Sequence, residues 1–86
     1  MESLNLVTYN HNMKTNLLNQ TLATNLRSYR QRLGISQEKL SELLDVHRNT
    51  VALLEAGKRG ISLELLEKLA QVLHCEPYEL LKPTVI

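Results

Sequence analysis

Four consecutive polar residues precede an apolar pair that is spaced as on one face of a helix. The four are His47, Arg48, Asn49 and Thr50. Val51 and Leu54 lie three residues apart and predict a buried rear face, with the polar run on the opposite side. Arginine and asparagine can each form two hydrogen bonds with the edge of a purine base. A short helix of this kind has what recognition in the major groove of DNA requires.

The segment before this run predicts a second helix, which would hold the first in place. Ser36 can cap its start, and the acidic Glu38 lies in its first turn. Four residues recur on one face at helical spacing: Gln37, Leu40, Ser41 and Leu44. Asp45 and Val46 then interrupt the pattern, and aspartate tolerates the left-handed backbone that a tight turn often needs. The spacing alone therefore predicts two short helices joined by a turn.

Three further helices are expected around this pair. The first, over about residues 22–33, ends at Gly34 and has one apolar stripe. This stripe consists of Leu22, Leu26, Tyr29 and Leu33. Another begins after the capping residue Ser62 and is apolar on one face. That face consists of Leu63, Leu66, Ala70 and Leu73, with Leu69 beside them. Pro77 opens a short fifth helix, and Pro83 prevents its continuation.

The composition indicates one all-α domain with an unevenly charged surface. The 86 residues include three tyrosines and no tryptophan or phenylalanine, so the core must be aliphatic. The net charge is only +1, but basic residues gather in the first two-thirds of the chain. They include Arg27, Arg30, Arg32, Arg48, Lys58 and Arg59. The segment from Ile61 onward is net acidic, which predicts a basic and an acidic face, the alternative being a mixed solvated surface.

Several classes of function lack the residues they need. The lone Cys75 excludes an internal disulfide, is compatible with a reducing cytoplasm and reads as a small buried residue. Neither a metal-ligand spacing nor a phosphate-binding glycine loop or nucleophile motif is present, so we expect no metal, no cofactor and no enzymatic activity. No apolar run is long enough to cross a membrane, and we expect a cytoplasmic protein.

The run from Leu26 to Leu81 resembles the small helix-turn-helix domains of lambdoid phage repressors and related xenobiotic-response-element regulators. The matching stretches are SQEKLSELLDVHRNTVALLEAGKR, ISLELLEKLAQVL and PYELL. The resemblance implies a five-helix repressor-type bundle in which the third helix enters the major groove. We divide the chain into an N-terminal arm, strand-like or extended, at 1–21, a DNA-binding domain at 22–82 and an apolar tail at 83–86.

The resemblance also implies roles for single residues. It assigns a phosphate contact to Gln37 and base contacts to Arg48 and Asn49, with guanine and adenine as their natural partners. His47 either caps the third helix or touches phosphate. Leu53 departs from the family's polar residue and either contacts a thymine methyl or is half-buried. Ala56 is a second departure from the family pattern. Some relatives have an asparagine there that contacts phosphate, and that contact is absent here.

Six more residues complete the predicted site, four for DNA contact and two for a structural role. Lys58 and Arg59 are expected to bind phosphate from a basic loop. Thr50 and Arg27 are further candidates for DNA contact. Arg30 and Glu55 resemble an ion pair that fixes the recognition helix in the phage repressors, which is a structural role.

The expected partner is a palindromic operator in double-stranded DNA, bound by a homodimer of a bacterial or phage regulator, most simply a repressor. We favour a C-terminal dimer patch over the arm residues Leu4, Leu6 and Val7. The patch consists of Tyr78, Leu80, Leu81, Val85 and Ile86. The alternative function is a protein-binding module, such as an antitoxin that binds a toxin and uses DNA binding for autoregulation.

Overall fold

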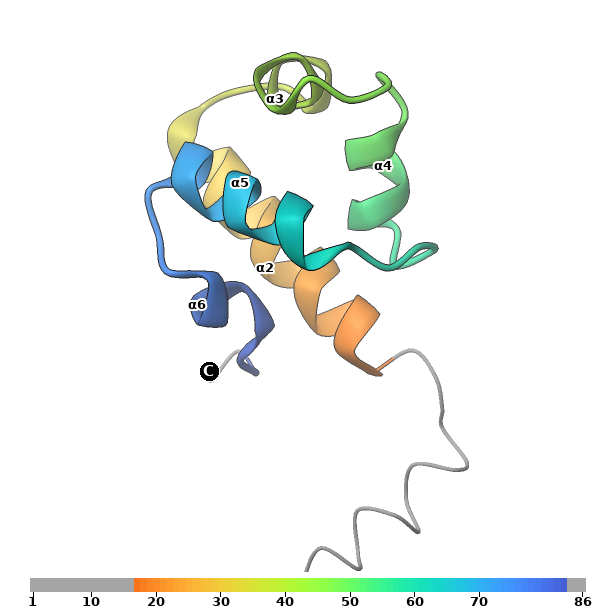
Figure 1. Ribbon diagram of the computed structural model, residues 1–86, viewed down its shortest axis with the longest axis vertical. Helices are drawn as coiled ribbons and strands as arrows, with labels where there is room; N and C mark the ends of the chain where they lie inside the picture. The colour runs from red at the N-terminus through yellow and green to blue at the C-terminus, as the bar shows by residue number, and fades with distance from the viewer. Residues whose placement is uncertain (1–16, 84–86) are drawn as a thin grey trace, which may run out of the picture.

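The computed structural model describes residues 17–83, which form five helices and no strand. The helices are α2 (Leu17–Leu33), α3 (Gln37–Leu44), α4 (Thr50–Glu55), α5 (Leu63–Leu73) and α6 (Pro77–Leu81). Figure 1 shows α2 running diagonally through the molecule, where it contacts α4, α5 and α6. The helix α3 packs on α4 and α5 at one end. The predicted all-α, five-helix architecture is therefore confirmed for these residues.

The helix α2 begins at Leu17, earlier than the expected start near Leu22. The boundary of the arm at residue 21 was therefore wrong, because residues 17–21 are helical. Extending an existing helix costs far less than nucleating one, and the run LLNQT contains no proline or glycine to stop it. Leu17 and Leu18 stay exposed, so this turn has no apolar stripe for a periodicity argument to find. The expectations for residues 1–16 and 84–86 lie outside the described residues.

The core is one aliphatic cluster to which every helix contributes. Its buried members are Leu22, Leu26, Leu40, Leu44, Val51, Leu54, Leu66, Leu69, Ala70, Leu73 and Leu80. Two expected core positions were wrong. Leu33 is 40% exposed at the end of α2, and Leu63 is 79% exposed at the start of α5. Each has the correct helical spacing but lies at a helix terminus, where the stripe runs past the neighbouring helices.

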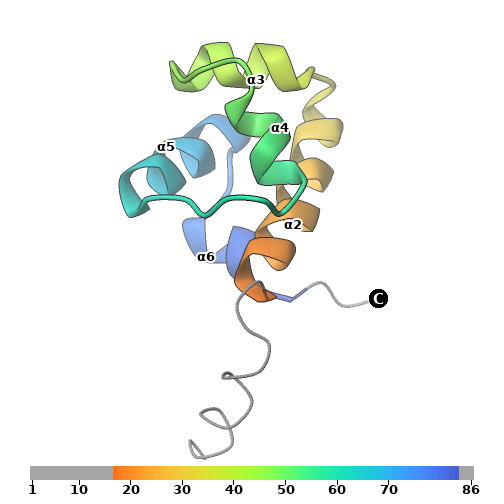
Figure 2. The same ribbon diagram turned by 90° about the vertical axis from the view of Figure 1, so that its right-hand side faces the viewer.

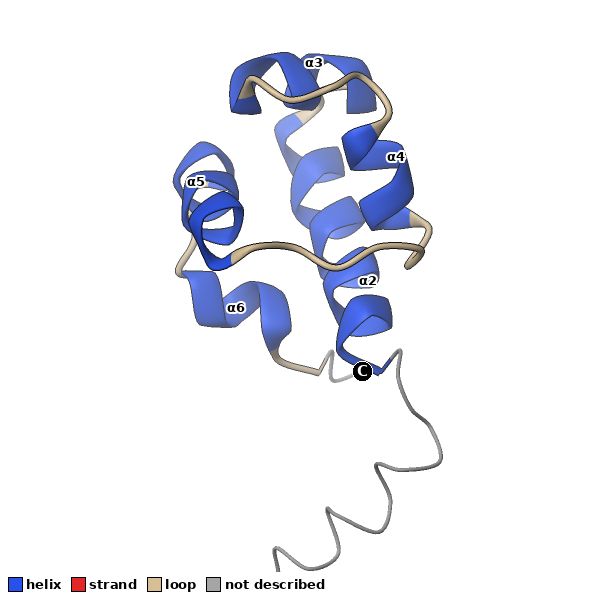
Figure 3. Ribbon diagram, turned by 45° about the vertical axis from the view of Figure 1, so that its right-hand side comes forward, coloured by secondary structure: helices blue, strands red, loops and turns tan. Residues whose placement is uncertain are grey.

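The predicted helix ends agree with local backbone chemistry. The Ser36 hydroxyl accepts the Lys39 N–H at 2.9 Å, and the Ser62 hydroxyl accepts the Leu65 N–H at 3.0 Å. Asp45 has a φ of 59°, which is the left-handed conformation expected in the turn. Figure 3 shows the resulting alternation of helices and short loops.

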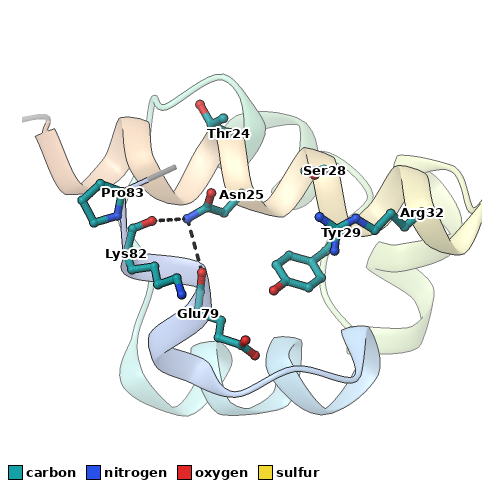
Figure 4. Close-up of a pocket in the computed structure, with 8 residues that line it drawn as sticks. All are labelled: Thr24, Asn25, Ser28, Tyr29, Arg32, Glu79, Lys82 and Pro83. Atoms are coloured by element: carbon teal, nitrogen blue, oxygen red, sulfur yellow. Dashed lines mark hydrogen bonds between the residues drawn. The ribbon is translucent and has the colours of Figure 1, made fainter. Parts of the chain in front are cut away.

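The short helix α6 is held by a buried amide that the sequence did not reveal. The Asn25 side chain on α2 donates to the carbonyls of Leu80 at 3.0 Å and Lys82 at 2.8 Å, with Glu79 farther away at 3.4 Å. Figure 4 shows Asn25 pointing from α2 toward the end of α6. Carbonyls at a helix C-terminus lack partners within the helix, so this side chain caps α6.

The described part of the expected C-terminal patch, Tyr78, Leu80 and Leu81, is less exposed than expected. Among its described members, Leu80 is fully buried in the chain's own core, Leu81 is partly buried and Tyr78 is widely exposed, at 64%. Cys75 is only half-buried, although a buried residue was expected. Desolvation, together with the negative charges of Glu79 and Glu76, raises the pKa of the Cys75 thiol above its usual value.

Candidate nucleic-acid interface

The helices α3 and α4 form a compact unit joined by a tight turn. Val51 and Leu54, the predicted rear stripe of α4, are both fully buried. The turn is tied back to α3, because the Val46 N–H donates to the Ser41 carbonyl at 3.0 Å. The buried Ser41 hydroxyl also donates to the Arg48 carbonyl at 3.5 Å. The backbone that precedes α4 is therefore fixed against α3.

The residues assigned to base recognition lie in the turn just before α4. His47, Arg48 and Asn49 are all exposed, and the Arg48 side chain is 74% accessible. Asn49 is the N-cap residue, but its side chain makes no capping hydrogen bond. Instead, His47 Nδ1 accepts the Asn49 N–H at 3.1 Å, which matches the capping alternative for His47. The side-chain amide of Asn49 therefore makes no bond that caps α4.

The next position does not belong to this exposed set. Thr50 is only 7% exposed, so the expectation that it faces outward was wrong. It precedes the buried Leu54 by four residues and therefore lies on the same helix face. Leu53 is 43% exposed, which leaves its outer methyl groups accessible to an apolar partner. A contact between Leu53 and a thymine methyl stays a prediction.

The buried Glu55 at the end of α4 joins three elements. Its carboxylate accepts from Arg30 Nε at 2.6 Å and from Arg30 Nη2 at 3.0 Å, so the expected ion pair is present. Gln37 Nε2 donates to the same carboxylate at 2.9 Å, and Arg27 Nη2 donates to the Glu55 carbonyl at 2.8 Å. The bonds to Glu55 raise the pKa of Arg30 despite its partial burial.

This arrangement changes the interpretation of two predicted DNA contacts. The side chains of Gln37 and Arg27 both donate to Glu55 at the end of α4. The Arg27 side chain remains 49% accessible, whereas Gln37 is half-buried. The two backbone N–H groups that open α3 precede the Lys39 N–H, which Ser36 accepts. A helix N-terminus of this kind attracts an anion through its N–H groups and its dipole.

The basic loop after α4 is exposed. Lys58 and Arg59 are both accessible, and within residues 17–83 neither has a carboxylate at ion-pair distance. Arg59 Nε donates to the neighbouring Gly60 carbonyl at 3.1 Å. Gly57, with a φ of 70°, turns the chain from α4 into this loop close to Gln20 on α2. Figure 2, viewed from the α4 side, shows the loop crossing in front of α2.

One further side chain supports the unit and was missed from the sequence. Lys68 Nζ on α5 donates to the Leu44 carbonyl at 2.8 Å. It caps the C-terminal end of α3 with a cation, where the helix dipole favours positive charge. A lysine on an amphipathic helix normally reads as a solvated residue, so no local signal distinguishes this one.

In residues 17–83 no helix is both long and apolar enough to span a membrane. The same residues contain no group of three or more side chains suited to hold a metal ion.

The order and packing of the helices match a known family. The helix-turn-helix family model matches residues 26–80. The chain belongs to the XRE-type helix-turn-helix family. Family membership makes it a DNA-binding transcription regulator rather than an enzyme.

Individual relatives agree with this assignment. The control protein C.SmaI of Serratia marcescens is 36% identical over 64 residues, which cover 74% of this chain and 76% of the relative. The crystal structure of the restriction-modification controller protein C.AhdI of Aeromonas hydrophila matches with a TM-score of 0.68 and 39% identity. The match covers 72% of this chain and 94% of C.AhdI. The hypothetical transcription factor NHTF of Neisseria matches with a TM-score of 0.74 and 36% identity, covering 77% and 76% of the two chains.

Proposed function

We propose that the chain regulates transcription by binding a specific operator, with α4 and the turn before it in the major groove. The observation that carries this proposal is the contrast across α4. Its rear is locked by Val51, Leu54 and Glu55, while Arg48 and Asn49 present exposed side chains on a fixed backbone. A backbone held in this way brings the two side chains to a base edge with little loss of backbone freedom on binding.

The phosphate backbone is held on both sides of α4 in this proposal. Lys58 and Arg59 bind phosphate from one side, because their charges are exposed and not paired with a carboxylate in the described part of the chain. The N-terminal N–H groups of α3 bind phosphate from the other side. Arg27 contributes only with the part of its side chain that Glu55 leaves accessible, and the Gln37 side chain positions α4.

We propose that two copies bind together to a palindromic site. One domain of this size brings three or four side chains to the bases, which is too few to select one site in a genome. A two-fold dimer doubles the number of bases read, with half-sites about 34 Å apart. Leu63 on α5 and Tyr78 on α6 are the most exposed large apolar side chains in residues 17–83, and these two helices pack together. They are our candidates for the contact between copies.

We propose a restriction-modification operon as the genetic context. C.SmaI and C.AhdI support this choice, because one is described as a control protein and the other as a restriction-modification controller. The toxin-binding alternative has no such support. Repression and a cytoplasmic location go with this proposal.

Selection of bound sequences from a random DNA pool would test the reading role. We expect a two-fold symmetric motif, and Arg48→Ala should lose preference at one position in each half-site. That loss should amount to about 1–3 kcal/mol of discrimination. If Arg48→Ala selects the same motif with the same strength, Arg48 does not read a base. If the selected motif has no internal symmetry, the proposed dimeric site is wrong.

A further inference from the structure

An acidic side chain in α3 accompanies the arginine assigned to base reading. Arg48 Nη2 lies 3.9 Å from Glu38 Oε2, and the two side chains are 74% and 72% accessible. Lys58 and Arg59, assigned to phosphate, have no such partner in the described residues. Arg48 is therefore paired with a carboxylate, whereas the two cations of the loop after α4 are not.

Only the side chain of Arg48 remains to be oriented. Its carbonyl accepts from the Ser41 hydroxyl at 3.5 Å, and the next N–H is held by His47 Nδ1 at 3.1 Å. A groove of about 250 Å³ separates the turn from α3 and is lined by Glu38, Ser41, Glu42, Val46 and Arg48. The Glu38 carboxylate lies on the α3 side of this groove, where it can fix the direction of the guanidinium.

We propose that Glu38 is a positioning residue that orients Arg48 toward guanine and thereby raises operator specificity. The proposal rests on the reading role given to Arg48 above. A guanidinium has five N–H donors in a planar fork, and a guanine edge uses two of them. Glu38 can accept from a remaining donor while the guanine contact is made. A phosphate contact draws the same side chain toward the DNA backbone and loses the pair with Glu38.

The interaction between Glu38 and Arg48 should become stronger when the protein binds DNA. In the free protein both side chains are exposed, and water and salt screen such a pair almost completely. Docking in the major groove of DNA excludes water, and the same two charges then interact more strongly. The effect of Glu38 should therefore appear in sequence discrimination and not in the stability of the fold.

Glu38 also has an opposite effect that the experiment must separate. A carboxylate near the phosphates repels every DNA sequence to the same degree. Removing it raises the affinity for all DNA and leaves the ratio between two sequences unchanged. The ratio of affinities for two duplexes is therefore the quantity that isolates the orientation of Arg48.

The test uses Glu38→Gln in the full chain, with Glu42→Gln as the matched control. Glu42 is another exposed acid on α3, 74% accessible, and its partner Lys39 lies 3.7 Å away. Affinities are measured for the selected operator and for the same duplex with the base read by Arg48 changed. We expect Glu38→Gln to lower the ratio about three- to fivefold, the size of a weak ion pair. Glu42→Gln should leave it unchanged.

A second pair of variants separates the possible failures. In the Arg48→Ala background, Glu38→Gln should cause no further loss, because no guanidinium remains to orient. If Arg48→Ala itself leaves the ratio intact, the proposed reading role fails and the inference falls with it. If Arg48→Ala lowers the ratio but Glu38→Gln does not, the inference alone is overturned. An equal loss from Glu38→Gln with and without Arg48 would also overturn it.

Discussion

The two sides of α4 are built in opposite ways. The rear is buried and consists of aliphatic residues and one carboxylate, Glu55, which accepts hydrogen bonds from Arg30 and Gln37. The front has exposed polar side chains whose backbone is fixed, as at Arg48 and Asn49. Substitutions on the rear should therefore change stability, and substitutions on the front should change DNA recognition.

The Glu55 network should give the largest effect. Arg30→Ala leaves a buried carboxylate with only part of its hydrogen bonds, and we expect a loss of about 3–5 kcal/mol in unfolding free energy. Glu55 is 3% exposed, so water cannot replace the lost partner fully. Chemical denaturation of Arg30→Ala, Glu55→Ala and the double variant measures the coupling. Strictly additive losses would mean that the ion pair does not stabilise the fold as a unit.

The bond between α2 and α6 should give the next largest effect. Asn25→Ala leaves the Leu80 and Lys82 carbonyls without their side-chain donor, and the expected loss of stability is about 1–3 kcal/mol. Asn19→Ala is the control, because Asn19 is on the same helix and only partly buried. Thermal unfolding of both variants provides the comparison. Equal small shifts would show that the capping of α6 contributes little.

The contrast between local and long-range signals explains what the sequence could predict. Ser36, Asp45 and Ser62 act on their own neighbours in the chain, so residue type and spacing were enough to place the helix ends. Thr50 was misassigned although it precedes the buried Leu54 by four residues, a spacing that already places it on the buried face of the helix. Asn25 and Lys68 have partners that lie 54–57 and 24 residues away, and only the packed fold brings them together.

Asn49 is exposed and its neighbour Thr50 is buried, so this pair tests the difference between the front and the rear of α4. Asn49→Ala should lower base discrimination by about 1–3 kcal/mol. It should not change stability, because its side chain makes no capping bond. Thr50→Val keeps the shape of a buried residue and should leave the selected motif unchanged. Site selection combined with thermal unfolding distinguishes the two, and a changed motif in Thr50→Val would contradict its placement on the rear.

Lys58 should give the smallest effect on specificity and a clear effect on salt dependence. Lys58→Ala removes one exposed cation from the loop after α4, so its phosphate contact is lost equally from operator and unrelated DNA. The slope of log affinity against log salt concentration should become shallower by about 0.9 for each lost contact. Lys82→Ala is the charge-matched control, since Lys82 borders the cavity between α2 and α6 and not the basic loop. Titrations of both variants at several salt concentrations decide the matter. If the two slopes change equally, Lys58 makes no phosphate contact of its own.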